Sequence, residues 1–321
     1  MSDFSAVAWS SNVVSQIKKE IIGQDKLIER LLIGLMCNQH ILIEGVPGVA
    51  KTLTVNTLAK TLSLSFNRIQ FTPDLLPSDL IGTLIYNPTT GVFSPKLGPL
   101  FANIILADEI NRAPAKVQSA LLEAMQERQI TIGDKTFPLD RPFMVLATQN
   151  PIDQEGTYPL PEAQIDRFMM KVHVDYPTHE EEVEILNRHS LDSSKEAVSA
   201  VSSKEDLAKL SALVDEVFID ETVKHYIVDI VSATRKPSQF GLKLDNYISF
   251  GSSPRGVIAL AKAARAYALL QGRNWVGAED VREVAVDVLS HRLQVSYEAL
   301  AEEITSTSLI NKIINYIKLG K

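Results

Sequence analysis

Short apolar runs and longer segments with helical spacing alternate through the first half of the chain. A short apolar run between such segments is typical of a strand that is buried on both faces of a parallel sheet. The alternation therefore predicts an α/β fold, with a five-stranded parallel sheet and its helices in residues 1–177. The expected strands are 41–43, 66–71, 104–107, 144–148 and 169–174.

Two insertions interrupt this alternation, at about residues 71–99 and 129–138. In the first, apolar segments lie on both sides of 89–91, and in the second they lie on both sides of 133–134. Small, turn-forming residues between two apolar segments predict a β-hairpin. Turn-forming residues indicate a backbone conformation and not a function. Ordinary surface connections are therefore the alternative interpretation of both insertions.

Helical patterns dominate from residue 178 onward. Acidic residues follow Pro177 and Thr178, which is typical of a helix start, and the small, polar stretch 191–203 indicates a linker. We therefore expect a connecting helix and linker at 178–203 and a smaller, all-α lid domain at 204–321. Apolar stripes at helical spacing must pack on other helices, and the expected lid helices are 204–218, 221–235, 255–271 and 278–288.

A phosphate-binding loop is the strongest chemical signal in the chain. Residues 45–52, Gly-Val-Pro-Gly-Val-Ala-Lys-Thr, follow the first apolar run and lead into a helical segment. In such a loop, backbone N–H groups surround the β-phosphate, the lysine reaches the β- and γ-phosphates, and the hydroxyl binds Mg²⁺. These roles fall to Lys51 and Thr52. Ala50 stands where the usual pattern has glycine, and its methyl group is tolerated if φ there is negative.

Polar side chains also follow two later strands. Asp108 and Glu109 come after the run 104–107, and Asn150 follows the run 144–148. Ligands bind at the carboxyl edge of an open parallel sheet, where these ends meet. In P-loop enzymes the first acid holds Mg²⁺ and a neighbouring Glu polarises the water that attacks the γ-phosphate. Asn150 would orient that water, whereas a solvated strand end is the alternative for the two acids.

Six segments together resemble the AAA+ ATPases, and within them the MoxR family. A loop with alanine before the lysine is characteristic of MoxR proteins, so Ala50 supports the resemblance. The match runs from Ile21 to about Arg292 and follows the family's order. The segments are 21–24 ahead of the loop, the loop 45–52, a Walker B run at 108–114, sensor 1 at 147–151, an arginine-finger segment at 160–168 and sensor 2 at 251–255.

The resemblance implies an ATPase that binds ATP or ADP with Mg²⁺ between the subunits of a ring, expected to be a hexamer. It assigns Mg²⁺ to Thr52 and Asp108. It assigns catalysis to Glu109, Asn150, Arg167 and Arg255. The residues that it assigns to nucleotide binding are Ile22, Gly23, Gln24, Gly45, Val46, Pro47, Gly48, Val49, Ala50, Lys51, Thr52 and Leu53.

The two arginines are expected to act differently. Arg167 precedes a strand at what would be the rim of the domain, so it should serve the neighbouring subunit's site; a surface ion pair with Asp166 or Glu162 is the alternative. Arg255 follows Pro254 at a helix start and is expected to reach the γ-phosphate of its own subunit. The helix dipole disfavours an arginine there, which indicates an anionic partner. A solvated side chain is the alternative for Arg255.

Composition narrows the choice of partners and location. The formal net charge of −7 argues against a broad basic surface for duplex DNA. The single cysteine, Cys37, excludes an internal disulfide and suits a reducing compartment. The scattered histidines argue against a zinc site. No apolar run approaches the ~18 residues of a membrane span and the start of the chain lacks a signal-peptide pattern, so we expect a cytoplasmic protein.

The work that the ring performs is expected from the resemblance alone. MoxR-like ATPases act as chaperones that remodel or activate client proteins, often ones with a von Willebrand A or metal-dependent module, and metal-cofactor insertion is in keeping with this role. Two alternatives of other classes are a non-hydrolysing nucleotide switch or scaffold and an AAA+ DNA motor. The intact acid pair argues against the switch, and the acidic balance argues against the motor.

Overall fold

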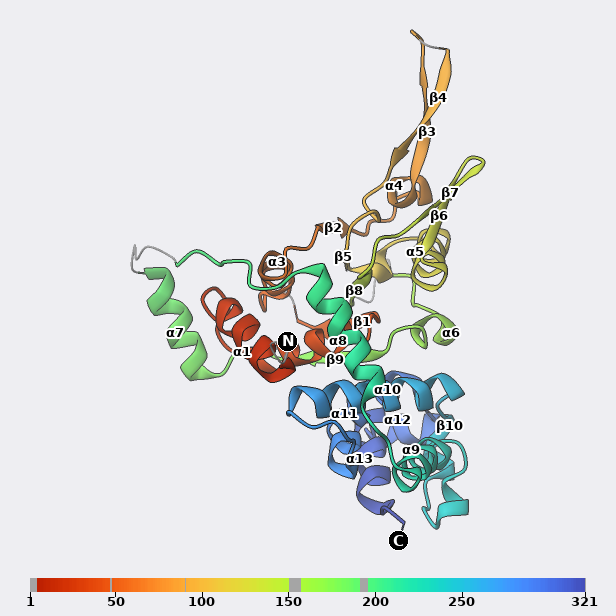
Figure 1. The fold of residues 1–321 in the computed structure, drawn as a ribbon. Helices are drawn as coiled ribbons and strands as arrows, with labels where there is room; N and C mark the ends of the chain where they lie inside the picture. Colours follow the sequence, from red (N-terminus) through yellow and green to blue (C-terminus); the bar gives the residue numbers. More distant parts are fainter. Residues whose placement is uncertain (1–4, 47, 90, 150–156, 191–195, 321) are drawn as a thin grey trace.

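A five-stranded parallel sheet forms the centre of the molecule (Figure 1). The computed structural model describes residues 5–46, 48–89, 91–149, 157–190 and 196–320. The order across the sheet is β2-β5-β8-β1-β9, and every neighbouring pair is parallel. This sheet confirms the expected α/β fold. Its strands are β1 (Ile41–Gly45), β2 (Phe66–Gln70), β5 (Ile104–Asp108), β8 (Met144–Gln149) and β9 (Met170–Val174).

Alternate residues of the central strands enter two separate hydrophobic cores, because successive side chains of a strand point to opposite faces. Ile41 and Ile43 pack in the first core, whereas Leu42 packs in the second. Burial on both faces explains why these strands are continuous apolar runs. The first core includes α1 (Ala6–Ile17), α2 (Asp25–Met36) and α3 (Lys51–Thr61), and the second includes α4 (Pro77–Ile81) and α5 (Ala115–Glu127).

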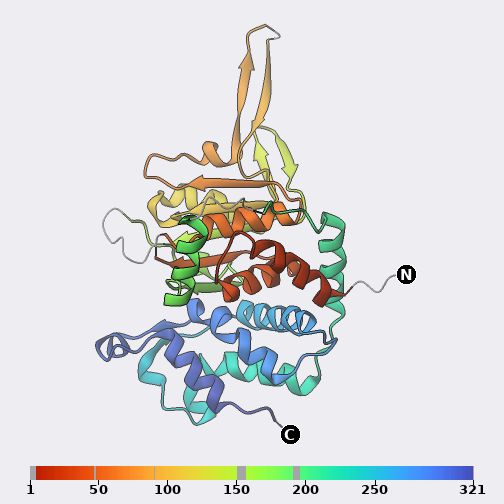
Figure 2. The same ribbon diagram turned by 90° about the vertical axis from the view of Figure 1, so that its left-hand side faces the viewer.

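Two antiparallel hairpins extend from the core domain. The longer one, β3 (Gly82–Asn87) and β4 (Val92–Leu97), rises far beyond the sheet, and β6 (Gln129–Ile132) with β7 (Lys135–Pro138) lies beside its base (Figures 1 and 2). Tyr86 and Phe93 on the longer hairpin are 50% and 61% exposed, with ring centroids 5.1 Å apart. This hairpin therefore presents aromatic side chains that the core does not cover.

A helical lid domain lies below the core (Figure 2). Among the described residues it departs from the expected all-α structure in a short antiparallel pair, β10 (Ile248–Phe250) with β11 (Gln294–Val295), and in an isolated parallel bridge between Phe218 and Trp275. Within the described ranges, no helix is both long and apolar enough to cross a membrane. Two helices precede the lid, α6 (Glu162–Ile165) and α7 (His179–Ser190). The α-helices from residue 204 onward are α8 (Lys204–Glu216), α9 (Glu221–Ala233), α10 (Pro254–Leu270), α11 (Ala278–Leu289), α12 (Tyr297–Ala301) and α13 (Ser306–Tyr316).

A buried arginine joins the core to the lid. Arg30 of α2 is fully buried, and its Nε donates to Oδ2 of Asp287 on α11 at 2.8 Å. Its Nη2 also donates to the carbonyl and the carboxylate of Glu283, at 3.0 and 2.9 Å. Lys26 pairs with the other carboxylate oxygen of Asp287 at 3.0 Å. The lid is thus held by charged hydrogen bonds as well as by the first hydrophobic core, which it shares with the sheet.

Replacing Arg30 with alanine is expected to lower the free energy of unfolding by roughly 3 kcal/mol, because the buried carboxylate of Asp287 then keeps only Lys26. Urea unfolding followed by fluorescence measures the change. Lys224→Ala is the matched control, because Lys224 is half exposed and pairs with Glu221 on the surface, so its removal should cost less than about 1 kcal/mol. Equal losses in the two variants would contradict a structural role for the buried network.

Candidate functional site

The loop between β1 and α3 has the backbone of a phosphate cradle. Gly48 has φ of +87°, which a side chain would strain. Gly45 lies against β9, because a Cβ there would be 2.4 Å from the carbonyl oxygen of Val174. The first turn of α3 follows the loop at once, so its free N–H groups and helix dipole face the same space. The loop can therefore bind an anion through its backbone.

Ala50 differs from the expectation in one respect. Its φ is +56°, in the left-handed region, and not negative. Ala50 caps the N-terminus of α3, and the chain must turn sharply there from the loop into the helix. An alanine in this conformation costs about 1–2 kcal/mol relative to the right-handed region. The loop therefore carries local strain at the position where glycine is usual.

Lys51 lies over the loop. Its Nζ donates to the carbonyl oxygen of Gly45 at 2.8 Å. Burial lowers the pKa of Lys51, and the carboxylates of Asp108 and Glu109 oppose this shift. All three side chains line one cavity at the carboxyl edge of the sheet, which we call the phosphate cavity, and Thr52 and Gln149 line it as well. The structure thus brings together the loop and the acid pair that the sequence predicted.

The two carboxylates are held by neighbours that sequence reasoning missed. Asp108 accepts from the Thr148 hydroxyl at 2.6 Å and from Nη2 of Arg68 at 2.6 Å. Glu109 accepts from Nε2 of Gln70 at 2.9 Å. Arg68 and Gln70 are two positions apart on β2, and this spacing puts them on one side of the strand. Polar residues at the carboxyl end of the predicted strand β2 were the signal that could have identified them.

Glu109 has an unusual backbone conformation. Its φ is +56°, and its N–H donates to the Thr148 hydroxyl at 2.8 Å. The same hydroxyl donates to Asp108, so Thr148 on β8 positions both acids of β5. Arg112 lies 3.2 Å from the Glu109 carboxylate. A strained non-glycine residue that is held by several partners is typical of a functional position.

The donors in the phosphate cavity fit Mg²⁺. Thr52 offers a hydroxyl and Asp108 a carboxylate, and Mg²⁺ is usually held by few protein oxygens together with phosphates and water. No group of three or more His, Cys, Asp or Glu in the described part of the chain could hold a metal alone. Arg68 contacts Oδ2 of Asp108, so this arginine lies beside the proposed Mg²⁺ ligand.

A second cavity, the base cavity, continues from the loop. It has a volume of about 710 Å³ and shares Gly48, Val49, Ala50 and Leu53 with the phosphate cavity. Ile22 and Gln24, which the resemblance assigns to nucleotide binding, line one side. Gly23 adjoins them with φ of +67°. This size is within the range of small-molecule sites.

Helix α7 closes the base cavity from the other side, which the sequence did not predict. Ile185 and Arg188 of α7 line the cavity. Arg188 also donates to the carbonyl oxygens of Lys18 and Lys19 at 3.0 and 3.3 Å. The segment 178–203 was expected only to connect the two domains, so this part of the site depends on where the chain runs after β9.

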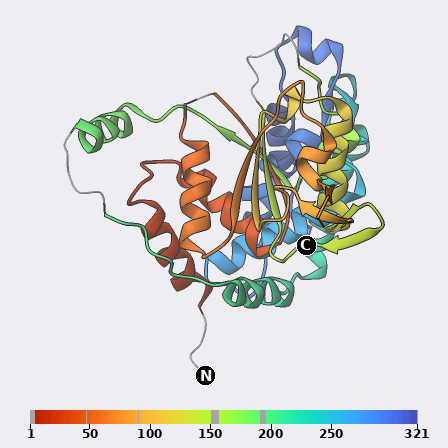
Figure 3. The same ribbon diagram turned by 90° about the horizontal axis from the view of Figure 1, so that it is seen from above.

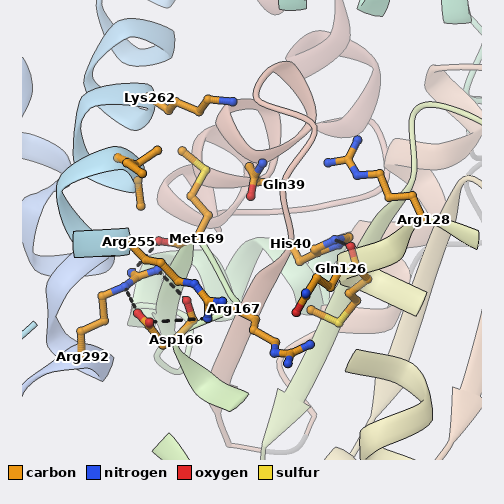
Figure 4. Close-up of a pocket in the computed structure, with 13 residues that line it drawn as sticks. Gln39, His40, Gln126, Arg128, Asp166, Arg167, Met169, Arg255, Lys262 and Arg292 are labelled. Atoms are coloured by element: carbon orange, nitrogen blue, oxygen red, sulfur yellow. Dashed lines mark hydrogen bonds and ion pairs between the residues drawn. The ribbon is translucent and has the colours of Figure 1, made fainter. Parts of the chain in front are cut away.

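Arg167 and Arg255 line a third cavity, at the opposite edge of the sheet (Figure 4). We call it the arginine cavity. His40 and Met169, which immediately precede β1 and β9, also line it. A five-residue strand such as β1 is roughly 16 Å long at about 3.3 Å per residue. The two arginines are therefore separated from Lys51 of their own subunit by the length of a strand.

This position differs from the expectation for Arg255, which was to reach the γ-phosphate of its own subunit. The lid packs against the amino edge, where Arg292 donates to the carbonyl oxygens of Phe168 and Met169 at 2.7 and 3.0 Å. That contact carries the start of α10 away from the phosphate cavity. Arg255 is 54% exposed and lies 3.7 Å from Asp166. Arg255 therefore has an anionic neighbour, as the sequence indicated, but this neighbour is the carboxylate of Asp166 and not a phosphate.

Arg167 lines the arginine cavity at the amino edge of the sheet. Its Nη1 donates to the carbonyl oxygen of Leu122 at 2.9 Å, and its Nε is buried without a hydrogen-bond partner among the described residues. Asp166 pairs with Arg292 at 2.8 Å and not with Arg167, so the alternative of a local ion pair is not supported. The guanidinium of Arg167 is therefore held by a carbonyl oxygen and not by a carboxylate of the described residues.

The floor of the arginine cavity is uncharged near neutral pH. His40 accepts from the N–H of Val145 at 3.0 Å through Nδ1, and its Nε2 lies 3.2 Å from the carbonyl oxygen of Met125. Burial lowers the pKa of His40 to about 4. Arginine and lysine side chains thus dominate the charge of this cavity, and Asp166 is the acid among its lining residues.

Two predicted site residues, Pro47 and Asn150, lie outside the described residues.

Known proteins match this chain over most of its length. The model of the "ATPase family associated with various cellular activities (AAA)" matches residues 40–170, and the "AAA lid domain" model matches residues 244–313. The chain is 50% identical to "Chaperone MoxR1" of Mycobacterium tuberculosis over 307 residues, 95% of this chain and 81% of that protein. It is 44% identical to "Uncharacterized protein YeaC" of Bacillus subtilis, over 95% of this chain and 93% of that protein.

A solved structure shares the whole architecture. The crystal structure of a Cytophaga hutchinsonii protein assigned as a candidate ATPase superposes with a TM-score of 0.92 at 51% sequence identity. The match covers 98% of this chain and 97% of that one. Core and lid are therefore similarly arranged in the two proteins.

Proposed function

The chain belongs to the MoxR family of AAA+ ATPases, and we propose that it hydrolyses ATP at sites that neighbouring subunits of a ring build together. The observation that carries this proposal is the separation of the site residues within one subunit. Lys51 and Glu109 lie at the carboxyl edge of the sheet, whereas Arg167 and Arg255 lie at the amino edge. A head-to-tail ring unites the two edges of adjacent subunits, and we propose a hexamer, as the resemblance implies.

The phosphate cavity would perform the chemistry as follows. The N–H groups of the loop and the Nζ of Lys51 bind the phosphates of ATP or ADP, while Thr52 and Asp108 hold Mg²⁺. Bound Mg²⁺ supplies charge neutralisation at the phosphate oxygens. Glu109, already held by Gln70, accepts a proton from the attacking water. Asn150 is proposed to orient that water, and the base lies between Ile22 and α7.

The arginine cavity would complete the site of the next subunit. In phosphoryl transfer, an arginine that a neighbouring molecule supplies stabilises the charge on the transferred group. Arg167 is the proposed finger because it is partly exposed in this cavity and its guanidinium is held by a carbonyl oxygen and not by a carboxylate. Arg255 adds a second cation beside it. Both are thus proposed to act in trans.

The first test measures the ATPase rate per subunit of the wild-type protein against protein concentration, with Mg²⁺ and saturating ATP. The rate is expected to rise with concentration and then level off, because each site needs two subunits. Lys51→Ala at the same concentrations measures contaminating activity. A rate that stays constant down to concentrations at which sedimentation shows only monomers would contradict a shared site, and no hydrolysis at any concentration would favour a nucleotide switch.

The proposed output is remodelling or activation of a client protein. The relative from M. tuberculosis is named a chaperone, and the exposed aromatic pair on the β3–β4 hairpin is suited to contact another protein. A client with a von Willebrand A or metal-dependent module, metal-cofactor insertion and a cytoplasmic location are further parts of this proposal. They rest on the family resemblance.

A further inference from the structure

We propose that the outer face of α7 docks on α10 of a second copy of the chain, next to the shared nucleotide site. This inference rests on the proposed function, because it requires the arginine cavity of one subunit to meet the base cavity of the next. It assigns a contact between two helix faces, of which only Arg255 has been given a role in the nucleotide chemistry. Their charge, their exposure and their positions support it.

Helix α7 has an uncovered outer face. It stands apart from the body of the molecule in two views (Figures 1 and 3). Val183 and Leu186 are 45% and 66% exposed, and a spacing of three residues puts them side by side on the helix. Glu180 and Glu182 flank this pair, and both are exposed. The face is therefore acidic around an apolar centre.

Helix α10 presents a face of the opposite charge. Arg255, Ile258 and Lys262 recur at spacings of three and four residues, which aligns them along one side of the helix. Ile258 is 61% exposed. Lys262 and Arg255 both border the arginine cavity (Figure 4), and Lys262 makes no ion pair within the described ranges. This face is basic around an apolar centre, so it complements α7.

The two faces lie where a shared site would bring them together. The inner side of α7 lines the base cavity through Ile185 and Arg188. The face of α10 borders the arginine cavity, whose arginines must approach the phosphates bound next to that base. Joining the two cavities therefore brings α7 of one subunit near α10 of the next. A second copy is the occupant because it supplies the matching charge and is already required there.

Charge reversal tests the contact. Glu182→Lys and Lys262→Glu are each expected to raise the protein concentration that gives the half-maximal ATPase rate by at least about tenfold, and the double variant is expected to return to within about threefold of wild type. Glu216→Lys on α8 and Lys312→Glu on α13 are matched controls, because both residues are exposed and lie outside the two faces. The controls should behave like wild type.

The outcomes separate this inference from the proposed function. If wild type depends on concentration but the single reversals match the controls, or if the double variant is no better than the worse single one, the docking contact is wrong and the shared site stands. If wild type shows no concentration dependence, both proposals fail. Binding of a fluorescent ADP analogue to dilute Lys262→Glu protein should equal that of wild type, since Lys262 does not line its own subunit's base cavity.

Discussion

Replacing Arg167 with alanine is expected to lower the ATPase rate at saturating ATP by roughly 10³–10⁵-fold, the range by which an arginine finger accelerates related reactions. The change should leave nucleotide affinity of the dilute subunit unchanged, because Arg167 lies at the amino edge of the sheet and the phosphate loop lies at the carboxyl edge. Arg167 loses one hydrogen bond, to the carbonyl oxygen of Leu122, so the loss of stability should be about 1 kcal/mol.

Mixing distinguishes a finger from a local structural residue. Arg167→Ala and Glu109→Gln are each expected to be inactive alone, but mixed rings contain some interfaces that pair an intact Arg167 with an intact Glu109. Partial recovery of the ATPase rate in the mixture is therefore expected. No recovery, despite mixed rings confirmed by mass spectrometry, would assign Arg167 a role within its own subunit.

The second large effect is expected at Glu109. Glutamine at this position removes the proton acceptor and should lower the rate about 10²–10⁴-fold. Its amide oxygen can still accept from Gln70, which holds the native side chain at 2.9 Å, so the cavity should keep its shape. The variant is thus expected to bind ATP with Mg²⁺ and to retain it without hydrolysis.

Lys51→Ala is the matched contrast to Glu109→Gln. Lys51 is the half-buried cation of the phosphate loop, so its loss should weaken binding of ATP and ADP rather than only slow the chemical step. Filter binding of labelled ATP, with analysis of the bound nucleotide, measures both properties. Equal affinity in the two variants would refute their separate roles, and a Glu109→Gln protein that turns over like wild type would exclude Glu109 as the base.

Features that depend on residues adjacent in the sequence were predictable from the sequence alone. The three central strands could be located because burial on both faces requires an apolar run in each, whereas apolar and polar residues alternate in the edge strand β9. The phosphate loop and the Asp108–Glu109 pair could be placed at one edge because parallel strands align their carboxyl ends. The contacts of Arg68 and Gln70 with those acids were missed, although polar residues on β2 indicated that something faced them.

Backbone conformation at the loop was harder to predict. The expectation for Ala50 was conditional on a negative φ, and the structure has +56°. A single methyl group does not forbid the left-handed region, and its cost of about 1–2 kcal/mol can be offset by the helix and strand on either side. The surrounding packing therefore determines the conformation at this position.

The sequence by itself determined the parallel sheet, the loop that can bind phosphate and the acids beside it, because periodicity and adjacency along the chain specify each of them. The tertiary structure alone decided three further features: the placement of Arg255 beside Arg167, the closure of the base cavity by α7, and the burial of Arg30 against Asp287, 257 positions away. These depend on how the lid packs on the amino edge. The packing of the lid is determined by contacts between residues far apart in the sequence, so no local sequence pattern could have predicted it.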